Sequence, residues 1–254
     1  MLFSRKLRAL IFGIWFRCGG WPIVISWDEV RFRLRKQHYQ LRSLIRFGPE
    51  PFLQNLLLMS ADGAVFIDIG ANIGVASLAM ARKVKWIIAF EPTRNAFEDL
   101  KFNASLNEFS NISSVPAAIS SSSGVMAMRA EPWWGHNSII ADAAQSLGKP
   151  VVNVPVLTLD SLLPFVVETC EGFGFEDRVL IKVDVEGHEL EVFRGGSELL
   201  SKLDNVIICF EAWDETYSQP CISHLERLGY EVFSPPIDTK DQDVFMRKIR
   251  AGLS

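Results

Sequence analysis

From Val65 onward, short apolar runs alternate with longer stretches that have a helical pattern of apolar residues. The apolar runs are rich in branched side chains and too short for ordinary helices, which is typical of strands buried on both faces. Such strands, alternating with helices, form a mostly parallel sheet with helices on both faces, so the predicted fold class is α/β. We predict core strands near 65–69, 86–91, 112–116, 179–185 and 205–211, and helices near 74–83, 94–107, 188–203 and 219–228.

Three further segments extend this pattern. Residues 124–130 and 151–157 have the pattern of extra strands inserted before the fourth core strand. The ending GYEVFSPPIDTKDQDVFMRKI has two apolar runs around a polar turn, which predicts two antiparallel strands. We therefore expect residues 61–254 to form one domain.

Residues 1–60 differ from the rest in composition, and we expect them to form a basic, aromatic helical extension. The first 48 residues contain ten Lys or Arg and two acids, whereas the whole chain has a formal net charge of −4 at pH 7. The body is therefore acidic, which weighs against a nucleic-acid partner. The apolar stretch from Ala9 to Phe16 is too short to cross a bilayer. Two interpretations of the extension remain: helices that cap the domain with Leu34, Leu41 and Ile45 inward, or a peripheral membrane contact with anionic lipid.

The cysteines bear on the cellular compartment. Cys18, Cys170, Cys209 and Cys221 lie far apart, with no C-x-x-C pair. This spacing indicates neither a zinc cluster nor a disulfide framework. We therefore expect a cytoplasmic location, with membrane association through the basic N-terminus as the alternative above.

The stretch FIDIGANIGVAS, from Phe66 to Ser77, predicts a strand, a tight turn and the start of a helix. Glu91 ends the next strand, where a carboxylate can accept the hydroxyls of a ribose, so the two features together indicate a nucleoside site. A dinucleotide-binding turn has glycine where this chain has Asn72, and the charge of Asp68 would repel a pyrophosphate. The same charge would attract the sulfonium of S-adenosyl-L-methionine, which we therefore expect as the cofactor instead of NAD.

Four motifs, in order, resemble those of one enzyme family. FIDIGANIGVAS, AFEP, LTLDSLL and IKVDVEGHEL are similar to motifs of the FkbM family of S-adenosylmethionine-dependent methyltransferases, over about residues 60–235. The resemblance implies a Rossmann-like class I methyltransferase fold, with a mostly parallel seven-stranded sheet and an antiparallel C-terminal strand. It also implies O-methylation of a hydroxyl of a small molecule, sugar or glycolipid. The residues that it implies at the cofactor are Asp68, Gly70, Ala71, Asn72, Gly74, Glu91, Pro92, Asn95 and Ala118.

The last of these motifs also carries the candidate catalytic residues. Polar and apolar residues alternate after Ile181, so strand geometry places Lys182, Asp184 and Glu186 on one side. Charged groups on a covered strand are costly unless they pair or reach a cleft, so we assign this edge and the adjacent His188 to catalysis. A hydroxyl acceptor loses its proton during methyl transfer, and a general base assists this step. Asp184 and His188 are alternative bases, with Lys182 as the charge partner of Asp184.

Two other interpretations of these residues stay open. One is an ion-pair network that only fixes the strand. The other is a Mg²⁺ site, because carboxylates and an imidazole are available from Asp184, Glu186, His188 and the strand-end Glu211. We assign no metal to this site.

The loop EPWWGHNS is the candidate acceptor site. Tryptophans stack on sugar or aromatic faces, and neighbouring polar side chains can bind hydroxyls, although aromatic packing across the inserted strands would also explain the loop. We therefore expect a small-molecule or glycan acceptor. Two other classes of function remain as alternatives: an NAD(P)-dependent oxidoreductase of similar fold, and a non-catalytic nucleoside-binding module. The residues expected at the acceptor are Trp133, Trp134, His136, Asn137, Glu211 and Trp213.

Overall fold

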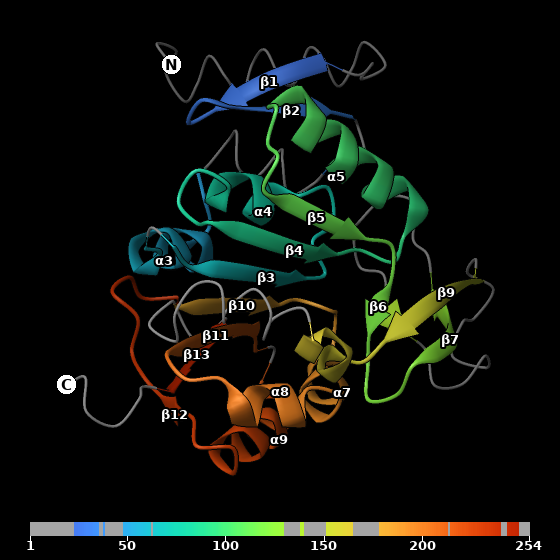
Figure 1. Ribbon diagram of the computed structural model, residues 1–254. Coiled ribbons are helices and arrows are strands. Elements are labelled where there is room, and N and C mark those ends of the chain that lie inside the picture. Colours follow the sequence, from blue (N-terminus) through green and yellow to red (C-terminus); the bar gives the residue numbers. More distant parts are fainter. Residues whose placement is uncertain are drawn as a thin grey trace.

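The computed structural model describes residues 23–35, 38, 48–61, 63–129, 138–139, 151–164, 178–212, 214–239 and 243–248. Its centre is a seven-stranded sheet with the order β12-β13-β11-β10-β3-β4-β5 (Figure 1). The strands are β3 (Val65–Ile69), β4 (Trp86–Phe90), β5 (Ile112–Val115), β10 (Val179–Val183), β11 (Val206–Glu211), β12 (Glu231–Val232) and β13 (Asp243–Lys248). The five strands from β5 to β11 are parallel, and β13 is antiparallel to both of its neighbours. The predicted fold class, the mostly parallel seven-stranded sheet and the antiparallel C-terminal strand are confirmed.

The two central strands, β3 and β10, are buried on both faces, which explains why their sequences are apolar apart from Asp68 and Lys182. Every residue of β3 and of β10 is buried. Because successive side chains of a strand point to opposite faces, Phe66 and Leu180 join one apolar cluster, whereas Ile67 and Ile181 join another. One cluster lies under α3 (Pro51–Met59), α4 (Val75–Met80) and α5 (Arg94–Leu106) (Figure 1). The other lies under α7 (Glu189–Arg194), α8 (Ser197–Lys202) and α9 (Glu215–Glu226).

The prediction of one helix over residues 188–203 is wrong, because two short helices occupy this stretch. α7 ends at Arg194 and α8 begins at Ser197. A Cβ atom on the intervening Gly195 would lie 2.0 Å from the backbone oxygen of Ser120. Glycine therefore allows the segment after β6 to approach, and a pair of glycines is unfavourable inside a helix.

A second, four-stranded sheet stands beside β5 at one end of the main sheet (Figure 1). Its strands are β6 (Ala118–Ile119), β7 (Gly124–Arg129), β8 (Ser138–Ile139) and β9 (Val151–Leu157), in the order β6-β9-β7-β8. The two inserted strands that the sequence predicts are therefore confirmed. Met128, Val154 and Val156 form a small apolar cluster on one face of this sheet.

The helical extension predicted for residues 1–60 is wrong for residues 23–34, which form an antiparallel hairpin of β1 (Ile23–Trp27) and β2 (Val30–Leu34). Burial alternates along β1, so the apolar period is two instead of the helical 3.6. The two turn residues, Asp28 and Glu29, have φ angles of 46° and 65°, which is the geometry of a two-residue hairpin turn.

Within the basic N-terminal segment, residues 1–22, 36, 37 and 39–47, which include Leu41 and Ile45, lie outside the described residues. Lipid contact through it therefore stays a prediction. Within the part of the chain that the structure describes, no helix combines the length and the apolar character needed to cross a membrane.

Candidate functional site

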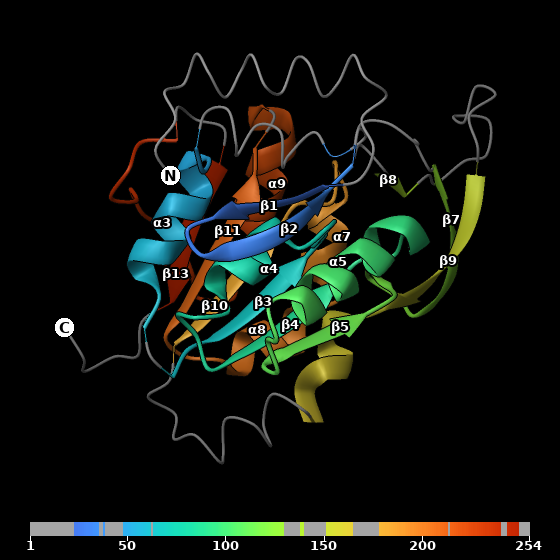
Figure 2. The same ribbon diagram turned by 90° about the horizontal axis from the view of Figure 1, so that it is seen from above.

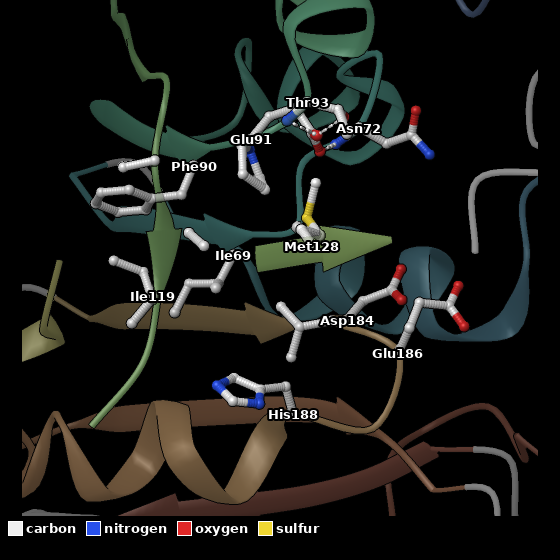
Figure 3. Close-up of a pocket in the computed structure, with 15 residues that line it drawn as sticks. Ile69, Asn72, Phe90, Glu91, Thr93, Ile119, Met128, Asp184, Glu186 and His188 are labelled. Carbon is white, nitrogen blue, oxygen red and sulfur yellow. Dashed lines mark hydrogen bonds between the residues drawn. The ribbon is translucent and has the colours of Figure 1, made fainter. Parts of the chain in front are cut away.

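A cavity opens at the carboxyl ends of β3, β4 and β10, with Met128 of β7 on one side (Figure 3); its space, together with the adjoining open solvent, is about 640 Å³. Ligands of open α/β sheets bind at this edge. The cavity brings together most of the predicted cofactor and catalytic residues. Those that line it are Gly70, Asn72, Glu91, Pro92, Ala118, Asp184, Glu186 and His188.

The turn from Gly70 to Gly74, called the glycine turn below, lies at the floor of this cavity, where the ends of β3 and β10 meet. Gly70 has a φ angle of 79°, and a Cβ atom there would lie 1.9 Å from the backbone oxygen of Asp184. No other residue type fits this contact. Asn72 also has a left-handed φ angle of 51°, which asparagine tolerates better than most residues. Gly74 then precedes the first residue of α4.

Glu91 holds the glycine turn against the loop after β4. Its Oε2 accepts from the backbone N–H of Asn72 at 2.8 Å, and its Oε1 accepts from the backbone N–H of Thr93 at 2.8 Å and from the Thr93 hydroxyl. Burial raises the pKa of Glu91, and these hydrogen bonds oppose the rise. A carboxylate offers about four acceptor positions, so Oε2 still has capacity for a ligand hydroxyl. Thr93 was missed by sequence reasoning, because a threonine before a helix is most simply explained as a helix cap.

Lys182 is the centre of a buried ion-pair network. Its Nζ lies 3.3 Å from Asp68 Oδ1 and 3.2 Å from Asp184 Oδ2, and it donates to the backbone oxygen of Gly70 at 3.1 Å. Burial acts to lower the pKa of Lys182, but Asp184 and Asp68 together raise it above its ordinary value, so the side chain is a cation. The predicted pairing of Lys182 with Asp184 is confirmed.

Asp68, which we expect at the cofactor, lies behind the wall of this cavity. Asp68 is 0% exposed and does not line the cavity; the Ser77 hydroxyl donates to its Oδ2 at 2.6 Å, and Lys182 faces its Oδ1. Strand pairing places Asp68 directly beside Lys182, so their charges compensate each other behind the cavity wall. Asp184 carries negative charge into the cavity instead.

Asp184 and Glu186 present neighbouring carboxylates at the cavity rim (Figure 3). Glu186 has a φ angle of 57° and Gly187 one of 92°, so the chain turns sharply as it leaves β10. Buried Glu189 stabilises this turn, because its Oε1 accepts from the backbone N–H groups of Val185 at 3.1 Å and Gly187 at 3.3 Å. A left-handed backbone at a non-glycine residue is uncommon, and such residues gather at functional sites.

His188 lines the cavity from the start of α7. Its side chain makes no helix-capping hydrogen bond, and its Nε2 lies 2.9 Å from the hydroxyl of Ser120, which is 2% exposed. Burial lowers the pKa of His188, although Glu191 acts in the opposite direction. The ring is therefore neutral at physiological pH and can accept a proton. Ser120 was missed, because in the sequence it belongs to a run of serines that indicates only a turn.

A second cavity of about 420 Å³ adjoins the first, and Asp184 lines both. Lys182 and Ala71 also line it, together with Glu50 and Phe52 at the start of α3. Burial and the charge of Asp184 raise the pKa of Glu50, and Lys182 lowers it. Sequence reasoning missed Glu50, whose one signal is its place directly before the proline that begins α3.

Some predicted residues lie elsewhere. Asn95 is exposed in the first turn of α5, and neither Asn95 nor Glu211 lines either of these two cavities. The four residues expected in the acceptor loop, Trp133, Trp134, His136 and Asn137, lie outside the described residues, as does Trp213. In the described ranges, no group of three or more His, Cys, Asp or Glu is arranged to hold a metal ion.

Acidic residues gather near Asp243, which begins β13: Asp184 follows β10, and Glu211 ends β11. Burial raises the pKa of Asp243 to about 7, and the charges of Asp184, Glu211 and Glu50 add to the effect while Lys182 opposes it. Between the ordinary value of 3.8 and about 7, the folded state keeps a proton on Asp243 that the unfolded state has released.

The free energy of unfolding should therefore fall as pH rises through this window. Replacing Asp243 with asparagine removes the titrating group, so the Asp243→Asn variant should lose less stability than the wild type as pH rises. Thermal unfolding of both proteins across the window measures the difference. Parallel pH profiles for the two proteins would show that Asp243 does not titrate in this way.

Comparison with known proteins identifies the family. The Methyltransferase FkbM domain matches residues 68–232, more than half of the chain. Methyltransferase sdnD of Sordaria araneosa is 32% identical over 191 residues, which are 65% of this chain and 73% of that protein. Hexuronic acid methyltransferase AglP of Haloferax volcanii is 28% identical over 162 residues, 63% of this chain and 62% of that protein.

A solved structure shares the fold. Methyltransferase FkbM from Methylobacillus flagellatus KT superposes with a TM-score of 0.50 at 15% identity, over 82% of this chain and 54% of that one. The chain thus spans about half of that structure and somewhat less than two thirds of AglP. Sequence match, fold and the predicted motifs agree. The chain belongs to the FkbM methyltransferase family.

Proposed function

We propose that this methyltransferase takes its methyl group from S-adenosyl-L-methionine and transfers it to a hydroxyl oxygen of a small molecule, sugar or glycolipid. The charge of the larger cavity is the observation that carries the proposal. Its described lining includes the carboxylates of Glu91, Asp184 and Glu186, and it includes no Lys or Arg. Such a lining attracts a positively charged sulfur and repels the pyrophosphate of a dinucleotide.

The residues present fit this cofactor. Glu91 retains acceptor capacity for a ribose hydroxyl, and the small side chains of Ala117 and Ala118 leave room for a flat base. The turn at Gly70 brings backbone close to the cavity floor without a side chain in the way. When bound, S-adenosyl-L-methionine supplies an activated methyl group on a cationic sulfur. The affinity of the protein for this cofactor would come from these residues.

The protein's part in the chemistry is alignment and proton removal. With S-adenosyl-L-methionine bound, the acceptor oxygen would take the methyl group from sulfur and would have to lose its proton to a base of the protein. We assign that proton to Asp184, because Lys182 pairs with its Oδ2 and the carboxylate reaches the cavity with its side chain 26% exposed. His188 is the alternative base, neutral and in the same cavity, with its Nε2 already bonded to Ser120.

The relatives support the acceptor class. Hexuronic acid methyltransferase AglP is named for a sugar acid, which offers oxygen nucleophiles. For this protein we therefore propose a hydroxyl-bearing acceptor, without naming an individual compound.

The test is mass spectrometry of cell extract incubated with the protein and with cofactor that carries a trideuterated methyl group. We expect a labelled product in the small-molecule or glycan fraction, with the label on oxygen. Heat-denatured protein is the control. Label found only on protein or nucleic acid would contradict the acceptor class.

A further inference from the structure

Asn103 of α5 joins the N-terminal hairpin to the glycine turn of the site. It is 0% exposed, and both of its amide atoms are used by different segments. Its Oδ1 accepts from the backbone N–H of Arg33 at 2.8 Å, and its Nδ2 donates to the backbone oxygen of Ile73 at 3.0 Å. Figure 2 shows β2 lying alongside α5. A buried amide with both ends used fixes two neighbours at once.

Other residues of α5 also bond the hairpin and the residues that follow it. One turn after Asn103, Asn107 accepts from the backbone N–H of Arg31 at 2.7 Å and donates to the backbone oxygen of Arg31 at 2.7 Å. One turn before it, Asp99 pairs with the side chains of Arg33 and Arg35 and with His38. One face of α5 therefore supplies hydrogen-bond partners for the backbone groups on the outer edge of β2, which would otherwise be an unpaired strand edge.

The other hydrogen bond of Asn103, to Ile73, reaches the turn at the proposed cofactor site. Ile73 lies in the turn between Asn72 and Gly74, and the backbone N–H of Asn72 donates to Glu91 at 2.8 Å. A Cβ atom on Gly74 would lie 2.4 Å from Leu100, so the same face of α5 also packs against this turn. The position of the Asn72 N–H thus depends on how Ile73 is held.

We propose that Asn103 is a positioning residue for cofactor binding, because it holds the Ile73 carbonyl and with it the turn that places Asn72 and Glu91. Asn103 touches no part of the cavity, so it acts through these residues. The proposal rests on the proposed function, since it takes the larger cavity as the cofactor site. It also connects that site with a hairpin that precedes the matched family region, residues 68–232.

Two other asparagines provide matched controls. Asn55 is also 0% exposed, and both of its amide atoms bond Ile237, at 2.7 and 2.8 Å, which joins α3 to the segment before β13. Asn107 bonds the hairpin and α5 but not the glycine turn. Replacing either should lower stability without displacing Ile73.

The test is calorimetric titration of the full chain with S-adenosylhomocysteine. The Asn103→Asp variant keeps an acceptor for Arg33 but presents a carboxylate oxygen to the Ile73 carbonyl, so we expect about tenfold weaker binding. Asn55→Asp and Asn107→Asp should bind within about twofold of the wild type, although their melting temperatures fall. If Asn103→Asp does not fold, Asn103→Ser, which removes both bonds without adding a charge, should give the same loss of affinity.

Wild-type affinity in both Asn103 variants would overturn the proposal. An equal loss in all three asparagine variants would also overturn it, because that result indicates general destabilisation. A wild-type protein that does not bind S-adenosylhomocysteine would instead overturn the cofactor assignment on which the proposal rests, so the two failures can be told apart.

Discussion

Replacing Lys182 with methionine is expected to lower the free energy of unfolding by about 3–5 kcal/mol. Lys182 is the cation 3.3 Å from Asp68, which is 0% exposed. Without it, a buried carboxylate keeps one hydrogen bond from Ser77 and loses its compensating charge. Urea denaturation of the Lys182→Met variant measures the loss.

Two controls make the result interpretable. Lys202→Met removes an exposed pair with Glu198, whose side chains are 55% and 60% exposed, and should change stability by no more than about 0.5 kcal/mol. The double variant Asp68→Asn with Lys182→Met should recover part of the loss, because position 68 then carries no uncompensated charge. A cost for Lys182→Met as small as that of Lys202→Met would show that the network does not stabilise the fold.

Replacing Asp184 with asparagine should slow methyl transfer by about 10²- to 10⁴-fold, the usual contribution of a general base. Asparagine has nearly the same shape but cannot take the acceptor's proton. The initial rate of trideuteromethyl transfer to the labelled product measures the effect, and titration with S-adenosylhomocysteine checks that the variant still binds the cofactor.

His188→Gln is the matched comparison, because His188 lies in the same cavity and is the alternative base. We expect it to slow transfer less than Asp184→Asn does. Wild-type rates in Asp184→Asn, together with a large loss in His188→Gln, would assign the proton to His188 instead.

The parts of the fold that could be predicted are those whose signals are local. β3 and β10 are short runs that are apolar apart from Asp68 and Lys182, which is the local pattern of a strand buried on both faces. The alternating pattern of the hairpin is local, but what stabilises it is not, because its outer edge is bonded by Asn103 and Asn107, some 70 residues later in the chain. No local pattern announces such a contact.

The same distinction applies to the contacts of the candidate site residues. The alternation after Ile181 correctly places Lys182 and Asp184 together, since spacing within a strand is local. The surroundings of Asp68 depend instead on the register between β3 and β10, which sets Asp68 beside Lys182. The register between two strands that lie more than 100 residues apart cannot be inferred from one sequence.

The most direct test of the account is calorimetric titration of the wild-type protein and a Glu91→Gln variant with S-adenosylhomocysteine and with NAD. We predict that the wild type binds S-adenosylhomocysteine at one site and does not bind NAD. Glu91→Gln should bind at least about tenfold more weakly, because the variant loses a carboxylate that holds Asn72 and Thr93 and that we propose as the acceptor for the ribose hydroxyl. Binding of NAD in place of S-adenosylhomocysteine, or equal affinity in the two proteins, would contradict the assignment of this cavity.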